Sequence, residues 1–209
     1  MRRSPLWPER EVTTLPDDRF EILFVCHANL CRSPLAERLT RHAIEDVFGR
    51  APEIFVSSAG THAVAGAPMY HRSAEVLDEL GVDSSGFTSR LLTPSMLNQA
   101  DLVVVAGREQ RAACVTLAPA TNRRAFTLRQ FGRFVTSLPT AALAAEGTTA
   151  DRFRVLVEQI DANRHLVRPT SAQEDDLPDP VGRPIDAFRV CADEIWQTMR
   201  GAVGVIAAA

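Results

Sequence analysis

The residues of this chain that are best suited to chemistry lie close together near its start. They form the segment Val25-Cys26-His27-Ala28-Asn29-Leu30-Cys31-Arg32-Ser33-Pro34. A cysteine thiolate is a strong nucleophile, and the planar guanidinium of an arginine can bind two oxygens of a phosphate at once. Since Arg32 follows Cys26 after a short loop, the segment predicts a thiol that attacks a bound phosphate or a similar oxyanion.

This chemistry requires the loop to lie between a strand and a helix. The run Phe20–Cys26 is short, mostly apolar and rich in strand-forming residues, which is typical of a buried parallel strand. Ser33 and Pro34 then favour a helix start, with Ser33 as the N-cap and Pro34 in the first helical position. The loop amides and the positive end of the helix dipole should hold a phosphate dianion and stabilise the thiolate of Cys26. We expect Asn29 and Ser33 to bond back to the loop backbone, and Ser33 can also donate to the Cys26 sulfur.

Beyond this loop, apolar strand-like runs alternate with stretches of helical spacing. The expected strands are 20–26, 54–56, 102–105 and 125–128, and the expected helices are 33–48, 72–80, a short one from Thr93, 109–117, 153–160 and 185–206. Such alternation indicates a parallel sheet with helices on both faces and a ligand site at the carboxyl ends of the strands. The predicted fold class is therefore α/β, a three-layer fold with a central four-stranded parallel sheet.

The predicted organisation is one folded domain preceded by an arm. Residues 1–19 are polar, contain three prolines and show no periodicity, so we expect a loosely ordered N-terminal arm. Residues 20–209 show no internal repeat and no second dense core, which favours a single domain. Its long segment 136–174 begins with a loop rich in small residues, and 168–184 is acidic and rich in proline, as expected of an exposed loop.

Composition and charge argue against several classes of function. Of 209 residues, 45% are apolar and 23% are charged, which is typical of a folded globular protein. All 23 basic residues are arginine, 26 residues are acidic and the net charge is -3, so neither a nucleic-acid surface nor an anionic-membrane surface is expected. The chain shows no secretory leader and no apolar run of the ~18 residues that a membrane span needs, and we expect a cytoplasmic protein.

The four cysteines give no sign of a metal site. They form no CxxC pair and have no histidine partner at zinc spacing, so neither a metal nor another cofactor is expected. Cys114 and Cys191 fall on expected helices among apolar neighbours and are interpreted as core residues.

The segment from Val25 to Glu37 resembles the phosphate-binding loop of the low-molecular-weight protein tyrosine phosphatases. The likeness runs from Ile22 to about Phe131 and resumes near Asp176. Its further motifs are Ser58-Ala59-Gly60-Thr61, Ser89-Arg90 with Leu92-Thr93, Ala100-Asp101 and Asp179-Pro180. The order and the spacing of these motifs are specific to this family and its close relatives.

The resemblance implies a role for each matching residue. Cys26 would be the nucleophile, Arg32 the clamp on the phosphate and Asp179 the general acid. The phosphate would be bound by the loop residues His27, Ala28, Asn29, Leu30, Cys31 and Ser33. The implied activity is metal-independent hydrolysis of a phosphotyrosine protein or a small aryl phosphate through a cysteinyl-phosphate intermediate. For Asp179 an alternative stays open, since Asp175, Asp176 and Asp179 also fit an ordinary solvated acidic loop.

Several residues around the expected substrate depart from the family pattern. Members usually carry an aromatic residue after the Asp-Pro pair, where this chain has Val181, and another after the second strand, where it has His62 among small residues. Tyr70 can fill this place; otherwise the mouth of the site is wider and less suited to phosphotyrosine. A histidine that supports the loop asparagine in many members is replaced by Phe87, and a Met-Asp pair is replaced by Ala106-Gly107.

Two other functions stay open for the same motifs. An arsenate reductase shares this loop and fold. A thioredoxin-coupled version needs two further cysteines close together, which Cys114 and Cys191 are not, but a version that uses an external thiol fits the sequence. The second is a catalytically weak module that binds phosphorylated ligands, although binding alone requires neither a thiolate nor an acid.

The resemblance also allows a protective disulfide between Cys26 and Cys31, which would make the enzyme reversibly oxidisable. The alternative for Cys31 is a small residue packed in the loop. The sequence gives no indication of the oligomeric state.

Overall fold

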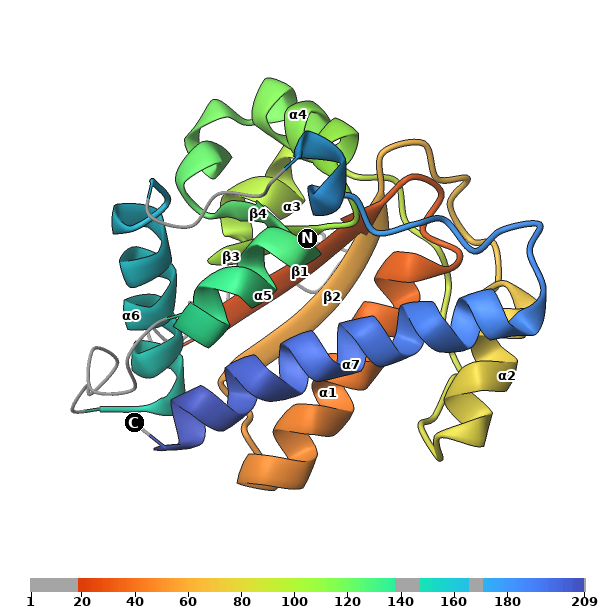
Figure 1. The fold of residues 1–209 in the computed structure, drawn as a ribbon, viewed down its shortest axis with the longest axis horizontal. Coiled ribbons are helices and arrows are strands. Elements are labelled where there is room, and N and C mark those ends of the chain that lie inside the picture. The colour runs from red at the N-terminus through yellow and green to blue at the C-terminus, as the bar shows by residue number, and fades with distance from the viewer. Residues whose placement is uncertain (1–18, 138–146, 166–170, 209) are drawn as a thin grey trace, which may run out of the picture.

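The computed structural model describes residues 19–137, 147–165 and 171–208, in which a parallel sheet lies between helices (Figure 1). Its strands are β1 (Phe20–Cys26), β2 (Ile54–Gly60), β3 (Leu102–Val105) and β4 (Ala125–Thr127). They pair in the order β2-β1-β3-β4, and every pairing is parallel. The predicted α/β class, with a four-stranded parallel sheet and helices on both faces, is confirmed.

Helices form the layers on either side of this sheet. They are α1 (Arg32–Phe48), α2 (His71–Glu79), α3 (Pro94–Gln99), α4 (Arg108–Leu117), α5 (Leu128–Ser137), α6 (Thr149–Ala162) and α7 (Ile185–Ala208), with 3-10 turns at Pro119–Arg123 and Ala172–Asp175. In Figure 1, α1, α5 and α7 lie in front of the sheet, α3 lies behind it and α4 lies at the top; Leu97 of α3 and Cys114 of α4 share one core cluster. None of the described helices is long and apolar enough to cross a membrane.

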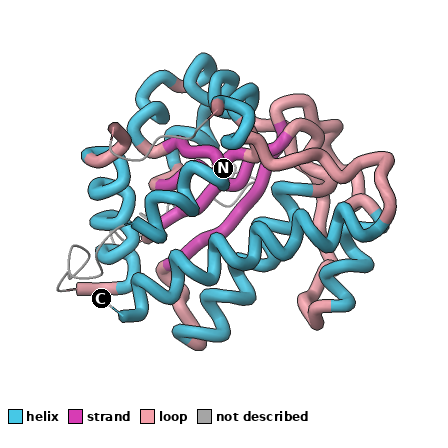
Figure 2. The backbone as a smooth tube through the Cα atoms, viewed as in Figure 1, coloured by secondary structure: helices cyan, strands magenta, loops and turns pink. Residues whose placement is uncertain are grey.

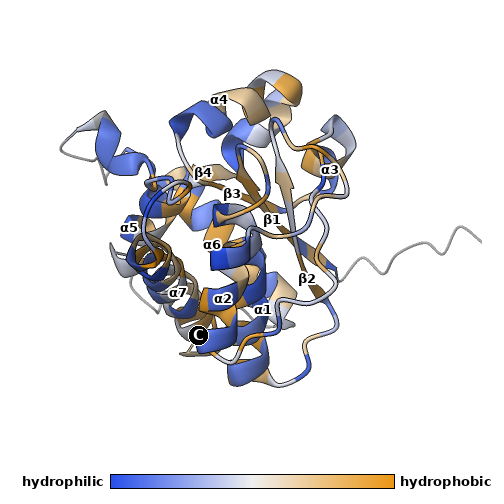
Figure 3. Cartoon of the chain, turned by 90° about the vertical axis from the view of Figure 1, so that its right-hand side faces the viewer, coloured by the Kyte–Doolittle hydropathy of each residue, from blue (hydrophilic) through white to orange (hydrophobic). Residues whose placement is uncertain are grey.

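Successive side chains of β1 point to opposite faces of the sheet and are apolar on both, which explains why both faces are covered by helices. Ile22 and Phe24 belong to the core under α1, α5 and α7, whereas Leu23 and Val25 belong to the core under α3 and α4. All four side chains are at most 2% exposed, and each such burial contributes roughly 1.5–3 kcal/mol to folding. A register shift of one residue would exchange the two faces, so these side chains fix the register of β1 in the sheet. In Figure 3, β1 and β2 carry hydrophobic colours accordingly.

The boundaries of several elements differ from those predicted, and helix α5 (Leu128–Ser137) was not predicted. Helix α1 begins at Arg32, because the Ser33 hydroxyl bonds to the Cys26 thiol and to the Ala59 carbonyl instead of capping the helix. Strand β2 continues to Gly60, since it stays paired with β1 along the full length of that strand. Leu128 opens α5 directly after β4, where a strand residue was expected.

Helix α6 lies at the end of the sheet that is remote from Cys26. Its Phe153 stacks on Phe20, the first residue of β1, with 5.2 Å between the ring centroids. A capping box between Thr148 and Asp151 begins the helix. Within the long segment 136–174, residues 138–146 and 166–170 lie outside the described residues, as does most of the expected arm, 1–18. The predicted domain organisation stays a prediction.

Loops at the carboxyl ends of the strands gather at one edge of the sheet (Figure 2). Cys26 ends β1 beside Gly60, which ends β2, and Val105 ends β3 next to them. The sequence predicted a ligand site at this edge, and the candidate site residues converge there.

Candidate functional site

The Cys26 thiol lies inside a loop that wraps the start of α1. Its residue is 2% exposed, its sulfur lies 3.0 Å from the Ser33 hydroxyl oxygen, and it accepts a hydrogen bond of 3.3 Å from the Asn29 backbone N–H. Because α1 begins at Arg32, the thiol also faces the positive end of a helix dipole. These contacts stabilise a negative charge on the sulfur.

Asn29 is the residue that shapes the loop. It adopts a left-handed backbone conformation with φ 55°, which asparagine tolerates better than most residues. Its side-chain amide donates to the hydroxyls of Ser33 and Ser58, at 2.9 Å each, and its Oδ1 accepts from the Arg90 backbone N–H at 2.8 Å. The sequence predicted bonds back to the loop backbone, whereas these bonds connect the loop to β2 and to Arg90. The Arg90 backbone N–H therefore supports Asn29 Oδ1, which the apolar side chain of Phe87 cannot do.

A buried polar network continues behind Asn29. The Ser58 hydroxyl donates to Glu37 Oε2 at 2.6 Å, and Arg41 pairs with the same carboxylate at 2.9 Å. The Arg90 guanidinium donates twice to the Ser58 carbonyl, at 3.0 and 2.7 Å. A fully bonded network of this kind rigidifies the loop it supports. We did not single out Glu37, Ser58 or Arg90 from the sequence, although each lies within a motif of the family resemblance.

The end of β2 presses directly on the back of the loop. A Cβ atom on Gly60 would lie 2.6 Å from the His27 carbonyl oxygen and 2.7 Å from the Asn29 nitrogen. Beyond it, the backbone N–H groups of Thr61 and His62 donate to the carbonyls of Cys26 and His27, at 3.0 and 2.8 Å. Only a glycine allows this approach, and it fixes the loop from the sheet side.

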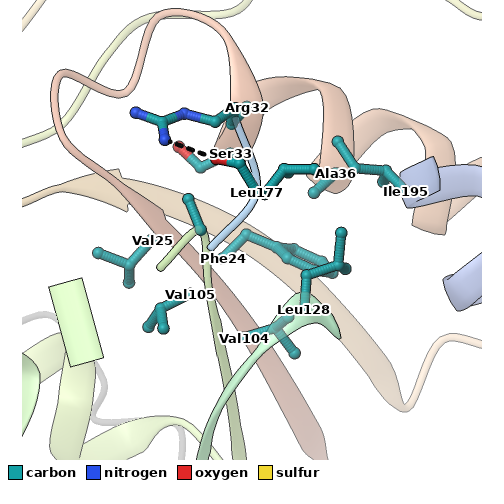
Figure 4. A pocket seen from close by; sticks show the side chains of 11 residues that line it. Phe24, Val25, Arg32, Ser33, Ala36, Val104, Val105, Leu128, Leu177 and Ile195 are labelled. Carbon is teal, nitrogen blue, oxygen red and sulfur yellow. Dashed lines mark hydrogen bonds between the residues drawn. The ribbon is translucent and has the colours of Figure 1, made fainter. Parts of the chain in front are cut away.

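Arg32 and Asp179 meet at the open side of the loop. Arg32 Nη2 donates to Asp179 Oδ2 at 2.5 Å, and Nη1 donates to the Leu177 carbonyl at 3.1 Å. The side chain of Arg32 is 11% exposed and that of Asp179 is 46% exposed, so solvent reaches the pair through the Asp179 carboxylate. Figure 4 shows Arg32 and Leu177 above apolar side chains of the core that include Phe24 and Leu128.

Residues 175–181, named here the acid loop, are anchored to the sheet and to two helices. The Leu177 N–H donates to the Ala106 carbonyl at 2.8 Å. Asp176 caps α4 by accepting from the Arg108 N–H at 2.7 Å, and the Arg108 guanidinium beside it lowers the pKa of this carboxyl group. Asp175 pairs with Arg133 of α5. Of the three acids that the sequence left as alternatives, only Asp179 contacts Arg32 among the described contacts.

The mouth of the site is a cavity of about 680 Å³. It is lined by His27, Arg32, Asp176, Leu177, Asp179 and the segment 106–110. No phenylalanine, tyrosine or tryptophan is among these lining residues, within the part of the chain that the structure describes. Tyr70 instead stacks on Phe188, with 5.5 Å between the ring centroids, and Val181 is 54% exposed.

The other three cysteines are buried. Burial raises the pKa of Cys31, Cys114 and Cys191 to about 12, so all three stay protonated at neutral pH. All four cysteines are free thiols, and the disulfide between Cys26 and Cys31 stays a prediction. The described residues contain no group of three or more His, Cys, Asp or Glu side chains placed to hold a metal ion.

The geometry can be compared with known proteins. The family model for low molecular weight phosphotyrosine protein phosphatases matches residues 21–138. The chain belongs to this family. It is 35% identical over 113 residues to a probable low molecular weight protein-tyrosine-phosphatase of Ralstonia solanacearum, an alignment that covers 54% of this chain and 73% of the relative.

Two further matches show the range of proteins that resemble this phosphatase-family chain. An arsenate reductase of Staphylococcus haemolyticus is 34% identical over 102 residues, which is 49% of this chain and 71% of the relative. The solved structure of an arginine phosphatase from Geobacillus stearothermophilus matches with a TM-score of 0.62 and 24% identity, covering 88% of this chain and 91% of that one. At this identity the structural match shows the fold alone.

Proposed function

We propose that this family member hydrolyses phosphate monoesters through a cysteinyl-phosphate intermediate, and that its substrates are phosphotyrosine proteins or small aryl phosphates. One observation carries the proposal. The Cys26 thiol lies at the start of α1, bonded to Asn29 and Ser33, within a loop whose open side holds the Arg32–Asp179 pair.

Substrate binding begins with an exchange at Arg32. The Asp179 carboxylate occupies Nη2 of this guanidinium when no ligand is present. A phosphate dianion is the better partner for the arginine fork, and the loop amides add further donors, so the phosphate takes the place of the carboxylate. The released Asp179 side chain then lies at the open side of the loop, where the ester oxygen of the substrate leaves.

The reaction proceeds in two displacements. Once it has left Arg32, the Asp179 carboxylate takes up a proton from solvent. Cys26 attacks phosphorus as the thiolate, so that an S–P bond forms while the P–O bond to the leaving group breaks, and Asp179 gives this proton to the departing phenolate. Water then attacks the cysteinyl phosphate, Asp179 takes a proton from it, and the S–P bond breaks to release inorganic phosphate. General acid–base assistance of this kind is typically worth ~10²–10⁴-fold in rate.

Arg32 and the loop amides provide the positive charge that both transition states require. They bond to the equatorial oxygens of the transferring phosphoryl group, whose charge grows during the reaction. We therefore expect turnover to continue in the presence of a chelator and without a cofactor. A reducing cytoplasm suits an activity that depends on a free Cys26 thiol.

The test is a kinetic comparison with p-nitrophenyl phosphate and a phosphotyrosine peptide in the presence of EDTA. We expect Cys26→Ser to abolish turnover and Asp179→Asn to lower kcat by ~10²-fold or more on the phosphotyrosine peptide. Asp83→Asn is the matched control, since Asp83 lies in an exposed turn and bonds to Ser85. Loss of activity on chelation, or full turnover by the serine variant, contradicts the mechanism.

The same proteins separate the competing functions. Arsenate-dependent oxidation of an added thiol, without phosphate release, would identify an arsenate reductase. Tight binding of a phosphotyrosine peptide without turnover would identify a phospho-ligand-binding module. A phosphoarginine peptide belongs in the panel because a matching solved structure is an arginine phosphatase.

A further inference from the structure

Two histidines form a stacked pair at the mouth of the site. The rings of His27 and His62 have centroids 4.4 Å apart and planes inclined by 20°. His27 directly follows Cys26, and His62 lies in the loop after β2, so the pair connects the two loops that meet at the carboxyl edge of the sheet. Both residues are exposed, and neither ring is part of the core.

The two rings differ in their relation to the cavity. His27 lines the 680 Å³ mouth together with Arg32 and Asp179, whereas His62 is not one of its lining residues. His62 therefore supports the His27 ring from outside the cavity. Stacking against a ring on a separate loop restricts the rotamers of His27, which an isolated surface histidine would sample freely.

The supporting ring is itself held in place. The His62 backbone N–H donates to the His27 carbonyl at 2.8 Å, and the Thr61 hydroxyl lies 2.9 Å from His62 Nδ1. Gly60, pressed against the loop, sets the position from which this segment departs. The His27 ring is thus oriented before any substrate arrives, so less conformational entropy is lost on binding.

The cavity contains no other planar ring among its described lining residues. A planar leaving group on a phosphate bound over Cys26 would contact the imidazole ring of His27. Offset stacking of two flat rings lowers the free energy of binding. We propose that His27 determines specificity for planar leaving groups by stacking on them, and that His62 is a positioning residue that holds the His27 ring. The proposal rests on the proposed phosphatase function and names aryl over alkyl esters as the favoured class.

The experiment compares two competitive inhibitors that share a phosphonate but differ in the ring: phenylphosphonate and methylphosphonate. We expect His27→Ala to raise the Ki of phenylphosphonate by about 3- to 10-fold and to leave the Ki of methylphosphonate within about twofold. His27→Phe should restore the difference between the two inhibitors. His62→Ala should give a smaller rise that His62→Phe reverses. In both alanine variants the KM for p-nitrophenyl phosphate should rise in parallel with the Ki of phenylphosphonate, and by a larger factor than kcat falls.

The control is His165→Ala, because His165 is exposed in the turn that follows α6. An equal change in both Ki values on His27→Ala would mean that the residue only shapes the loop, and no change in either would mean that it does not touch the leaving group. Either result overturns the proposal. A parent protein that binds both phosphonates but hydrolyses no aryl phosphate would instead refute the proposed function and leave the ring preference measurable.

Discussion

The contact between Gly60 and the phosphate-binding loop gives the sharpest test of how this site is built. In Gly60→Ala the new methyl group would lie 2.6 Å from the His27 carbonyl oxygen and 2.7 Å from the Asn29 nitrogen. Both neighbours are backbone atoms, so no flexible side chain can move aside. Restoring an ordinary contact of 3.4 Å from 2.6 Å requires β2 and the loop to separate by about 0.8 Å.

Two consequences of this displacement can be measured. Misplacing reacting groups by ~1 Å lowers rates by ~10²-fold, so we expect kcat/KM for p-nitrophenyl phosphate to fall by roughly 10- to 100-fold. Overpacking of this kind also lowers the free energy of unfolding by ~1–3 kcal/mol, which urea denaturation will measure. The Ki of inorganic phosphate should rise, because the loop amides that we propose bind it are displaced.

The matched control is Gly201→Ala. Gly201 lies within α7, and a Cβ there would meet nothing within 4 Å. We expect an unchanged kcat/KM and a gain of ~0.5–1 kcal/mol in unfolding free energy, since alanine favours a helix over glycine. Parental kcat/KM and phosphate affinity in Gly60→Ala would refute the conclusion that the strand end fixes the loop.

Three further changes test the supports of the site and the buried thiols. Ser58→Ala removes a donor to the buried Glu37 carboxylate, and we expect kcat/KM to fall about 10-fold and unfolding free energy to fall by ~1–3 kcal/mol. Arg133→Gln removes the partner of Asp175, and kcat should fall about 3- to 10-fold for p-nitrophenyl phosphate but less than about twofold for 2,4-dinitrophenyl phosphate, whose leaving group needs no proton. Burial raises the pKa of three thiols to about 12 in the folded protein. As the pH rises, these thiols therefore lose their protons in the unfolded chain before they do so in the folded protein. The free energy of unfolding should be unaffected below pH ~9 and should fall above it by up to ~1.4 kcal/mol per pH unit for each thiol.

The last two of these predictions each have an internal comparison. If Arg133→Gln lowered kcat equally for both aryl phosphates, the Arg133–Asp175 ion pair would not be what positions the acid loop. For the alkaline effect, urea denaturation between pH 8 and pH 11 should give a shallower slope in Cys114→Ala, which retains two of the three thiols. The absence of lysine makes this range informative, because only cysteines and one tyrosine have ordinary side-chain pKa values there. An identical slope in the variant would contradict the assignment to buried thiols.

The local signals that predicted the fold act over a few residues each. The apolar run of β1 and the helix that follows it depend on side chains close to one another in the sequence, and alternation of strands and helices then selects a parallel sheet. The boundaries of the helices and strands were predicted less well. Ser33 has the residue type of an N-cap, but its hydroxyl bonds to Cys26 and Ala59, a choice that depends on β2 being in place.

For the candidate site, the sequence predicted the loop and its residue types because the chemistry depends on one contiguous segment. Asp179 was left beside two other acids, and composition could not separate them. The structure distinguishes them by their partners: Arg108 binds Asp176, Arg133 binds Asp175, and Asp179 contacts Arg32. These pairings join segments far apart in the chain, so no local pattern encodes them.

The sequence by itself determined the α/β architecture and that Cys26, its loop and Arg32 lie between a strand and a helix, since propensity, periodicity and short spacings suffice for these. Only the tertiary structure decided which acid lies at Arg32, that Gly60 must lack a side chain, and that His62 supports His27. Each of these depends on the distance between atoms on different strands and loops, which is fixed when the two faces of the sheet are buried and the strands take their register.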